Sequence, residues 1–187
     1  MQLIRSATSM PARLIALFLD LLSLRRGPQD LPHAPPLVVA LVLAVLFLES
    51  WSSRALGVAA NLGPALVLSG LLALAIPWGV LRMRGLQARF WQTALALTGT
   101  GLVFALLALP LMLAMGPIDP ANPASIPPLL GWAIVLLAGW RLVVAGHIWR
   151  HAMEVPLPSG VLIALATFIA ELVLQRLLLG LVAGPAP

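Results

Sequence analysis

The chain has 187 residues, of which 61% are hydrophobic and only 9% are charged, and its mean hydropathy is +1.04. A soluble globular domain carries about a quarter charged residues, so this composition excludes a water-covered surface and indicates an integral membrane protein. The net charge of +5 comes from arginine at the ends of apolar segments, which predicts contact with anionic lipid rather than nucleic acid. The chain has no cysteine, which excludes disulfides and thiol chemistry.

Five apolar stretches are long enough to be membrane spans, since about 20 helical residues cross the hydrocarbon core. They lack the alternation of barrel strands, so their backbone groups must be satisfied within helices. The predicted fold is all-α, a polytopic transmembrane helical bundle of about five spans. The predicted spans are 37–51, 64–81, 90–115, 129–149 and 160–182. The first is the shortest, and its 12 unbroken apolar residues (37–48) leave an interfacial or re-entrant segment open.

Residues 1–36 are expected to form a cytoplasmic region, and 37–184 the transmembrane domain. A helix is predicted before the first span, with Ser9 as its N-cap and Gly27 after its last turn. A narrow polar stripe runs along it at helical spacing, formed by Arg13, Ala16, Asp20 and Ser23. We interpret it as an amphipathic helix lying in the membrane interface, followed by a proline-containing linker. A helix packed against the bundle is the alternative.

Arginine is concentrated on alternate connections between the spans. It precedes the first span, and it recurs between the second and third and between the fourth and fifth, as Arg82, Arg84, Arg89 and Arg150. The positive-inside rule then places the N-terminus in the cytoplasm and the C-terminus on the far side. We expect a multi-pass protein of the cell membrane, in the bacterial inner membrane with a periplasmic C-terminus.

Two opposite charges interrupt the last two spans at similar depth. Arg141 lies about 12 residues, or ~18 Å, from the outer end of its span, and Glu171 about 11 residues into the next. Consecutive spans are antiparallel neighbours, so we predict an intramembrane pair of Arg141 and Glu171, with Thr167 and Gln175 extending a polar stripe. A structural clamp is the favoured role, and a proton, ion or substrate path is the alternative. Glu49 is interpreted as an independent interfacial charge.

The fourth span ends in histidines spaced four residues apart, His147 and His151. This spacing can bracket a metal, but no HExxH pattern is present and His33 is the only further histidine. We therefore predict no metal site and no cofactor. The favoured interpretation is an aromatic and basic belt at the headgroup level, formed by His147, Trp149, Arg150, His151 and Glu154.

Glycines at spacings of eight and seven mark one side of the fourth span, at Gly131, Gly139 and Gly146. Small residues let a second backbone approach closely in a membrane. We expect them to form a helix-packing surface, with Gly99 and Gly101 of the third span as its partner.

The order of these segments resembles bacterial members of the Yip1 family of small polytopic membrane proteins. The stretches that carry the resemblance are the linker LRRGPQDLPHAPP before an apolar span and the short loop VPLPSG before the last one. The resemblance implies five spans with a cytoplasmic N-terminus, and a role in trafficking or partner binding rather than catalysis. The chain lacks tyrosine and has only Asp20 and Asp30 as acidic residues before the first span, so no functional residue is carried over.

No phosphate-binding glycine loop, serine-nucleophile elbow or other catalytic set is present in the sequence. We therefore expect a non-catalytic scaffold, assembly or membrane-organising protein, not an enzyme. Its expected partners are the lipid bilayer and either another protein or further copies of this chain. The alternative is a small transporter or channel, or an accessory subunit of one, that uses Arg141 and Glu171.

Overall fold

The computed structural model describes residues 10–57, 63–116 and 127–183. Within these ranges the chain is helical and contains no β-strand. In these ranges five helices are long and apolar enough to cross a membrane, which confirms the predicted all-helical fold with five candidate spans but not the interfacial placement of the preceding helix. They are α2 (Pro35–Ala55), α3 (Gly63–Met83), α4 (Phe90–Met115), α5 (Pro128–Met153) and α6 (Leu157–Ala183). Each predicted span lies within one of these helices.

Helix α2 is longer than the span predicted for it. Its 21 residues extend about 32 Å at 1.5 Å per residue, which is enough to cross the hydrocarbon core. Two prolines occupy its first turn, where a missing N–H costs no helical hydrogen bond. At the other end the helix continues through a serine-rich stretch, and the Ser52 hydroxyl donates to the Glu49 carbonyl oxygen at 3.1 Å. The count of 12 unbroken apolar residues therefore underestimated the length of this helix, and the helix is not too short to span a membrane.

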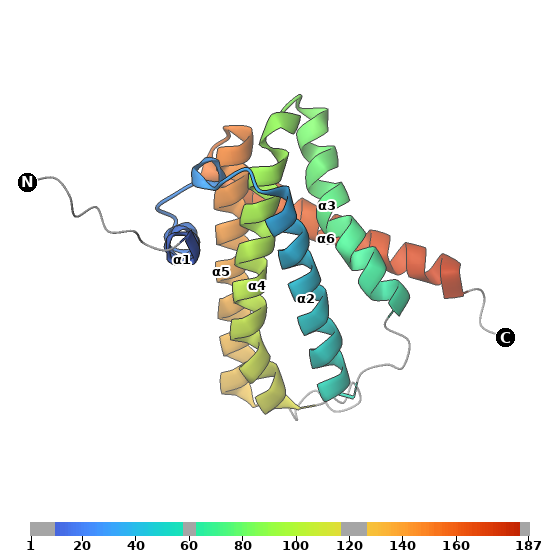
Figure 1. Ribbon diagram of the computed structural model, residues 1–187. Coiled ribbons are helices and arrows are strands. Elements are labelled where there is room, and N and C mark those ends of the chain that lie inside the picture. Colours follow the sequence, from blue (N-terminus) through green and yellow to red (C-terminus); the bar gives the residue numbers. More distant parts are fainter. Residues whose placement is uncertain (1–9, 58–62, 117–126, 184–187) are drawn as a thin grey trace, which may run out of the picture.

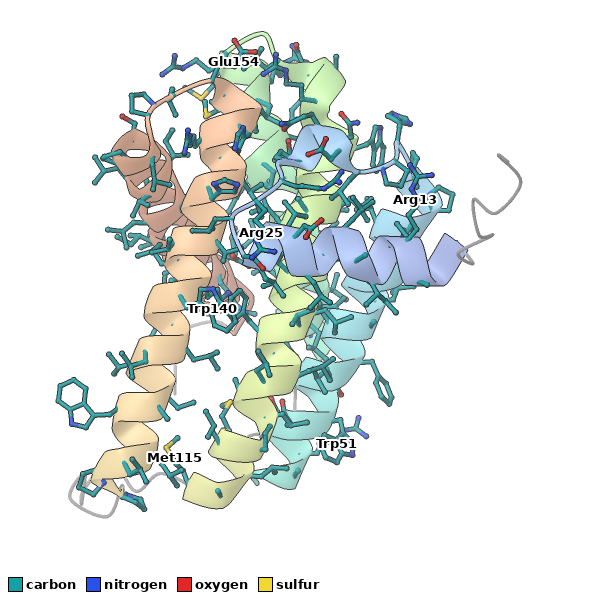
Figure 2. The ribbon with its side chains drawn as sticks, turned by 90° about the vertical axis from the view of Figure 1, so that its left-hand side faces the viewer. Arg13, Arg25, Trp51, Met115, Trp140 and Glu154 are labelled. Carbon is teal, nitrogen blue, oxygen red and sulfur yellow. The ribbon has the colours of Figure 1, made fainter. Side chains whose placement is uncertain are left out.

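Helices α2, α4 and α5 stand side by side, with α4 between the other two (Figure 1). Helix α3 leans away from them, and α6 leaves the Glu154 end of α5 at a steep angle and passes α3 (Figure 1). Trp51 and Met115 lie at one end of the bundle and Glu154 at the opposite end (Figure 2). Helices α2, α4 and α5 thus run between these two ends, whereas α6 is strongly inclined to them (Figure 1).

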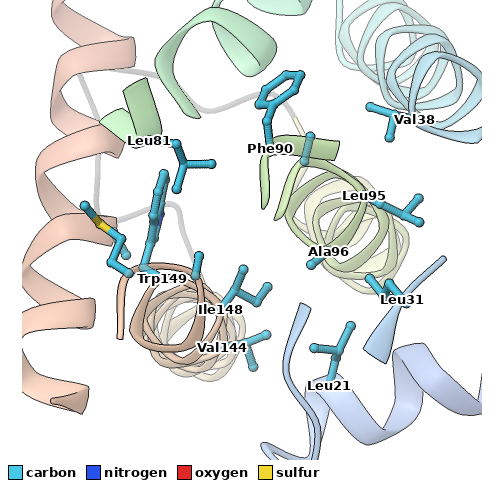
Figure 3. Packing of buried hydrophobic residues seen from close by; sticks show 14 of the residues in the cluster. Leu21, Leu31, Val38, Leu81, Phe90, Leu95, Ala96, Val144, Ile148 and Trp149 are labelled. Atoms are coloured by element: carbon cyan, nitrogen blue, oxygen red, sulfur yellow. The ribbon is translucent and has the colours of Figure 1, made fainter. Parts of the chain in front are cut away.

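The hydrophobic core is concentrated toward the end of the bundle that carries Glu154. Its largest fully buried side chain is Trp149 of α5, which packs near Ile148 and Leu81 (Figure 3). Helix α4 supplies most of the remaining buried positions, and the hydroxyls of Thr98 and Thr100 donate to carbonyls of their own helix at 2.7 Å. Such bonds let threonine be buried without a cost for an unpaired hydroxyl.

Helix α1 (Met10–Leu22) ends earlier than predicted, and Ser9 lies outside the described residues. Leu24 adopts a left-handed conformation with φ of 60°. Its N–H donates to the Leu21 carbonyl at 3.0 Å and that of Arg25 to the Asp20 carbonyl at 2.9 Å, the pattern of a Schellman motif. Glycine usually occupies this position, so the sequence suggested Gly27 as the helix end. A short 3₁₀ turn, η1 (Pro28–Asp30), then leads to α2.

The C-terminal end of α1 packs across α4 and α5 (Figure 2). Leu21 and Leu22 are buried there, and the Phe18 ring fills the space above Gly99, where a Cβ would lie 2.1 Å from a ring carbon. The outward side of α1 remains open, with Ile15 60% and Leu19 58% exposed. The described part of the chain therefore shows a helix that contacts the bundle at one end, as the alternative interpretation expected.

Candidate functional site

Polar side chains of four spans come together in the membrane-crossing part of the bundle. Arg141 of α5 interacts electrostatically with Glu49 of α2 and with Glu171 of α6, and the two carboxylates interact with each other. The Ser69 hydroxyl of α3 lies beside the Glu49 carboxylate. We call Glu49, Ser69, Arg141 and Glu171 the polar cluster. Ionisable residues inside a membrane are rare, and they commonly mark functional sites.

All four members stand well inside their helices. Arg141 lies 13 residues beyond Pro128 and Glu171 14 residues beyond Leu157, each about 20 Å from the helix start at 1.5 Å per residue. Glu49 lies six residues before Ala55 and Ser69 six residues after Gly63, each about 9 Å from that end. The cluster therefore lies well inside the apolar helices, with α2 and α3 contributing from the halves that are farther from Glu154.

The predicted pair of Arg141 and Glu171 is not in direct contact. The described part of the chain contains two ion pairs with a nitrogen–oxygen distance within 4.0 Å, Arg26 with Asp20 and Arg89 with Glu154, and neither includes Arg141. Arg141 and Glu171 nevertheless interact at longer range, and Glu49 shares the same surroundings. The structure thus replaces a two-residue clamp with a looser group of three charges.

The polar stripe of α6 lies on the half-buried side of that helix. Thr167, Glu171 and Gln175 are partly covered, whereas the described residues between them are mostly exposed. The Thr167 hydroxyl donates to the Ala164 carbonyl of its own helix at 2.9 Å. The stripe therefore faces the rest of the bundle, and Thr167 contributes its hydroxyl to α6 itself.

Glu49 is the functional candidate that the sequence interpretation missed. It was assigned to the outer interface as an independent charge, and the structure instead places it in the polar cluster. The error arose because the serines after Glu49 resemble the end of a span. A usable signal was present, because Glu49 follows the buried Val42 by seven residues and so lies on nearly the same helix face.

Two members of the predicted interfacial belt are buried instead. Trp149 is 1% exposed and His147 is 4% exposed, so neither lies at a lipid headgroup surface. His147 Nε2 lies 2.9 Å from the Arg26 carbonyl oxygen, to which it donates a hydrogen bond when Nε2 carries the proton. Trp140 and Gln92 donate in the same way to the Leu22 and Leu31 carbonyls, at 3.2 and 2.9 Å. These side chains hold the main chain of the N-terminal segment against the bundle.

The remaining belt residues surround the C-terminal end of α5. Arg150 and Glu154 are exposed, and His151 is half-buried against the His147 ring, with 4.5 Å between the ring centroids. Arg89 pairs with Glu154 and donates to the Ala152 carbonyl at 3.1 Å, which caps the end of α5. In residues 10–57, 63–116 and 127–183, no group of three histidine or acidic side chains could hold a metal ion.

The predicted glycine surface between the third and fourth spans does not form. Gly146 packs against α6, where a Cβ would lie 2.8 Å from the Val161 Cα, and Gly99 accommodates Phe18 of α1. A Cβ on Gly101 or Gly139 would meet no atom within 4 Å, so no other helix packs closely against either glycine. Gly131 is only half-buried. Spacing alone could not show which helix each glycine faces.

Comparison with known proteins adds no family to this description. No family model, no curated protein and no solved structure matches the chain. Its function is therefore argued from the geometry of the polar cluster and of the helices around it.

Proposed function

We propose that this is a non-catalytic integral membrane protein that assembles with another polypeptide inside the membrane and acts as a scaffold or membrane-organising protein. The observation that carries the proposal is Arg141. It is exposed in the single chain and forms no ion pair within 4.0 Å in the described ranges, although it lies mid-way along α5. A charge at the bilayer centre costs roughly 2.5–3.5 kcal/mol on insertion scales. A second chain that covers Arg141 and supplies acceptors would offset this cost.

The form of α6 supports the same proposal. After Ala164, every side chain described in this helix is exposed or half-buried. The helix departs from the upright bundle and is held along its length mainly by α5 and α3 (Figure 1). A span that carries a carboxylate but has so little cover from its own chain suits a helix-to-helix interface with a partner.

We further propose that α1 lies in the cytoplasmic interface of a bacterial inner membrane, with the N-terminus inside and the C-terminus in the periplasm. Its exposed Ile15 and Leu19 would enter the lipid, while Arg13 on its outer surface meets headgroups. Exposed arginines on the connections at the Glu154 end, Arg82, Arg84 and Arg150, support this orientation. We also propose a Yip1-like protein, on the resemblance of its sequence segments alone.

A second candidate function is a small transporter or channel subunit. The observation that favours it is the convergence of Glu49, Ser69, Arg141 and Glu171 from four separate helices, because transport paths in membranes are lined by such groups. The two functions differ in what surrounds Arg141. A partner protein covers it in the assembly function, and water reaches it in the transport function.

A single cysteine can distinguish the two functions, because the natural chain has none. Ala138 is exposed and lies one turn from Arg141 on the same side of α5, so Ala138→Cys reports on the surroundings of Arg141. Leu136→Cys is the matched control, since Leu136 is 71% exposed at similar depth but five residues away, about 140° around the helix. Both variants are expressed in native membranes, and the thiol is tested by short oxidative crosslinking and by a hydrophilic maleimide.

We expect Ala138→Cys to form a crosslinked product containing a second polypeptide, at a rate well above that of Leu136→Cys. Partners without cysteine are captured with a thiol-to-amine crosslinker. Efficient maleimide labelling without a crosslinked product would support the transport function instead. If Ala138→Cys neither crosslinks nor reacts with maleimide more than the control does, Arg141 faces lipid and the assembly proposal is wrong.

A further inference from the structure

Helix α1 presents three different sides to its surroundings. The side that faces the bundle carries the buried Leu21 and Leu22. A second side is apolar but uncovered, with Ile15 and Leu19 both more than half exposed. The third side is polar and is formed by Arg13, Asp20 and Ser23. An uncovered apolar strip of this kind usually marks a surface that meets another apolar phase or partner.

Helix α1 lies across α5 rather than along it (Figure 2). Trp140 of α5 donates to the Leu22 carbonyl, and His147 contacts the Arg26 carbonyl, so the chain at the end of α1 crosses α5 between these two side chains. Trp140 lies 12 residues beyond Pro128 and His147 lies 19 residues beyond it, about 18 and 29 Å at 1.5 Å per residue. The crossing is therefore about 24 Å from the start of α5.

The crossing of α4 lies at the same height. Phe18 packs over Gly99, which lies 16 residues before Met115, again about 24 Å from that end of the helix. A hydrocarbon core is about 30 Å thick, and an interfacial helix sinks about 5–10 Å into its boundary. With one boundary at the Met115 end, α1 thus lies at the depth of an interfacial helix at the other boundary.

The exposure of apolar side chains on α4 and α5 changes close to this height. All buried residues of α4 lie between Phe90 and Phe104, and all those of α5 lie between Val144 and Met153. The large exposed hydrophobic side chains of both helices all lie on the other side of these limits, toward Met115 and Pro128. Apolar side chains must be buried where water surrounds a helix, but they can face lipid freely. The change supports a hydrocarbon boundary near α1.

The charge around α1 is positive at both of its ends. Asp20 pairs with Arg26 at 3.0 Å, and the Asp30 carboxylate accepts a hydrogen bond from the backbone N–H before its own 3₁₀ turn at 3.1 Å. Arg13 and Arg25 stand exposed at opposite ends of the helix (Figure 2). Neither forms an ion pair within 4.0 Å among the described residues. Two arginines that flank an apolar strip match a surface with phosphates above and acyl chains below.

We propose that α1 binds anionic phospholipid at this boundary. Arg13 and Arg25 hold the negatively charged headgroups, while Ile15 and Leu19 enter the acyl chains between them. The inference rests on the proposed interfacial placement of α1 and adds the class of lipid that it takes. An acidic protein surface would match the arginines, but it would leave the uncovered apolar strip without a partner at the depth of the hydrocarbon.

Fluorescence quenching of the full chain in vesicles tests the proposal. Ala16→Cys introduces a single thiol for a fluorophore, because the natural chain has no cysteine, and Ala16 is exposed one turn before Leu19 on the same side of α1. The vesicles contain equal amounts of phosphatidylglycerol and phosphatidylcholine. In matched preparations one lipid or the other carries a nitroxide at the same acyl position near the headgroup, so quenching reports which lipid lies beside α1.

The phosphatidylglycerol quencher is expected to act much more strongly than the phosphatidylcholine quencher. Each arginine near the surface should favour the anionic lipid about fivefold. Arg13→Gln or Arg25→Gln should therefore each reduce the preference about fivefold, and the two changes together should remove it. Arg54→Gln is the matched control, because it removes the same charge from an exposed arginine in the last turn of α2, and it should leave the preference unchanged.

Three results would overturn the proposal, and they have different meanings. Equal quenching by the two lipids would mean that α1 lies in lipid but does not select anionic headgroups, which leaves its interfacial placement intact. A preference that persists when both Arg13 and Arg25 are replaced would mean that other groups attract the anionic lipid. If neither quencher acts on the label, α1 does not lie in the interface, and the proposed placement is wrong as well.

Discussion

Replacing Trp149 with alanine is expected to lower the free energy of unfolding by about 3–5 kcal/mol, the usual cost of deleting a fully buried large aromatic side chain. Trp149 is 1% exposed and packs with Ile148 and Leu81 (Figure 3). The cost arises from lost contacts and from the cavity left among helices that cannot close over it. Reversible unfolding of the purified protein in mixed micelles, followed by circular dichroism, measures the change.

Trp132→Ala is the matched control for this prediction. Trp132 belongs to the same helix but is 67% exposed, so its removal should change the free energy of unfolding by less than about 0.5 kcal/mol. Equal losses for the two variants would mean that Trp149 is an interfacial residue after all. The comparison therefore separates the buried core seen in the structure from the headgroup belt suggested by the sequence.

Gly160→Ala is expected to destabilise the protein by roughly 1–3 kcal/mol, in the range of overpacked interiors. A Cβ at this position would lie 2.2 Å from the Gly146 carbonyl oxygen and 2.9 Å from the Arg150 backbone nitrogen. Backbone atoms cannot rotate away as a side chain can, so α5 and α6 must separate at this contact. The same unfolding measurement in mixed micelles applies.

Gly139→Ala provides the contrast. A Cβ there would meet nothing within 4 Å, so the substitution should be neutral or stabilise α5 by up to about 1 kcal/mol through helix propensity. A loss at Gly139 as large as that at Gly160 would show that the helices pack through the predicted glycine surface rather than through the contact between α5 and α6.

The spans could be predicted from the sequence because length and apolarity are local properties. Each predicted span corresponds to one helix, and even the doubtful first span became a helix of 21 residues once its serine-rich end was included. The end of α1 was not predictable in the same way, because Leu24 occupies a left-handed position where glycine is the usual signal.

Long-range contacts account for most of what the sequence could not provide. His147 and Trp149 resemble an interfacial belt in composition, yet the N-terminal segment folds back and covers this end of the bundle, where His147 meets the Arg26 carbonyl. Nothing near His147 in the sequence indicates a partner 121 residues away. The helix against which each glycine packs could not be predicted for the same reason.

The polar cluster was predictable in part: the depth of two of its residues followed from the sequence, whereas their contacts did not. Counting residues along consecutive spans placed Arg141 and Glu171 at similar depth, and the structure brings them within electrostatic reach. They form no direct ion pair, and α6 tilts away from the upright bundle, an angle that no single-helix pattern contains (Figure 1). Glu49 of α2 interacts electrostatically with the same two charges, which helix-by-helix counting could not reveal.

Native mass spectrometry of the full chain, released directly from its own membrane, tests the central claim that Arg141 is covered by another polypeptide. The expected result is a multiple of the 19.7 kDa chain or a complex with a second protein, and loss of that assembly in Arg141→Gln. A single chain of 19.7 kDa carrying only lipid, in the wild type and the variant alike, would contradict the claim.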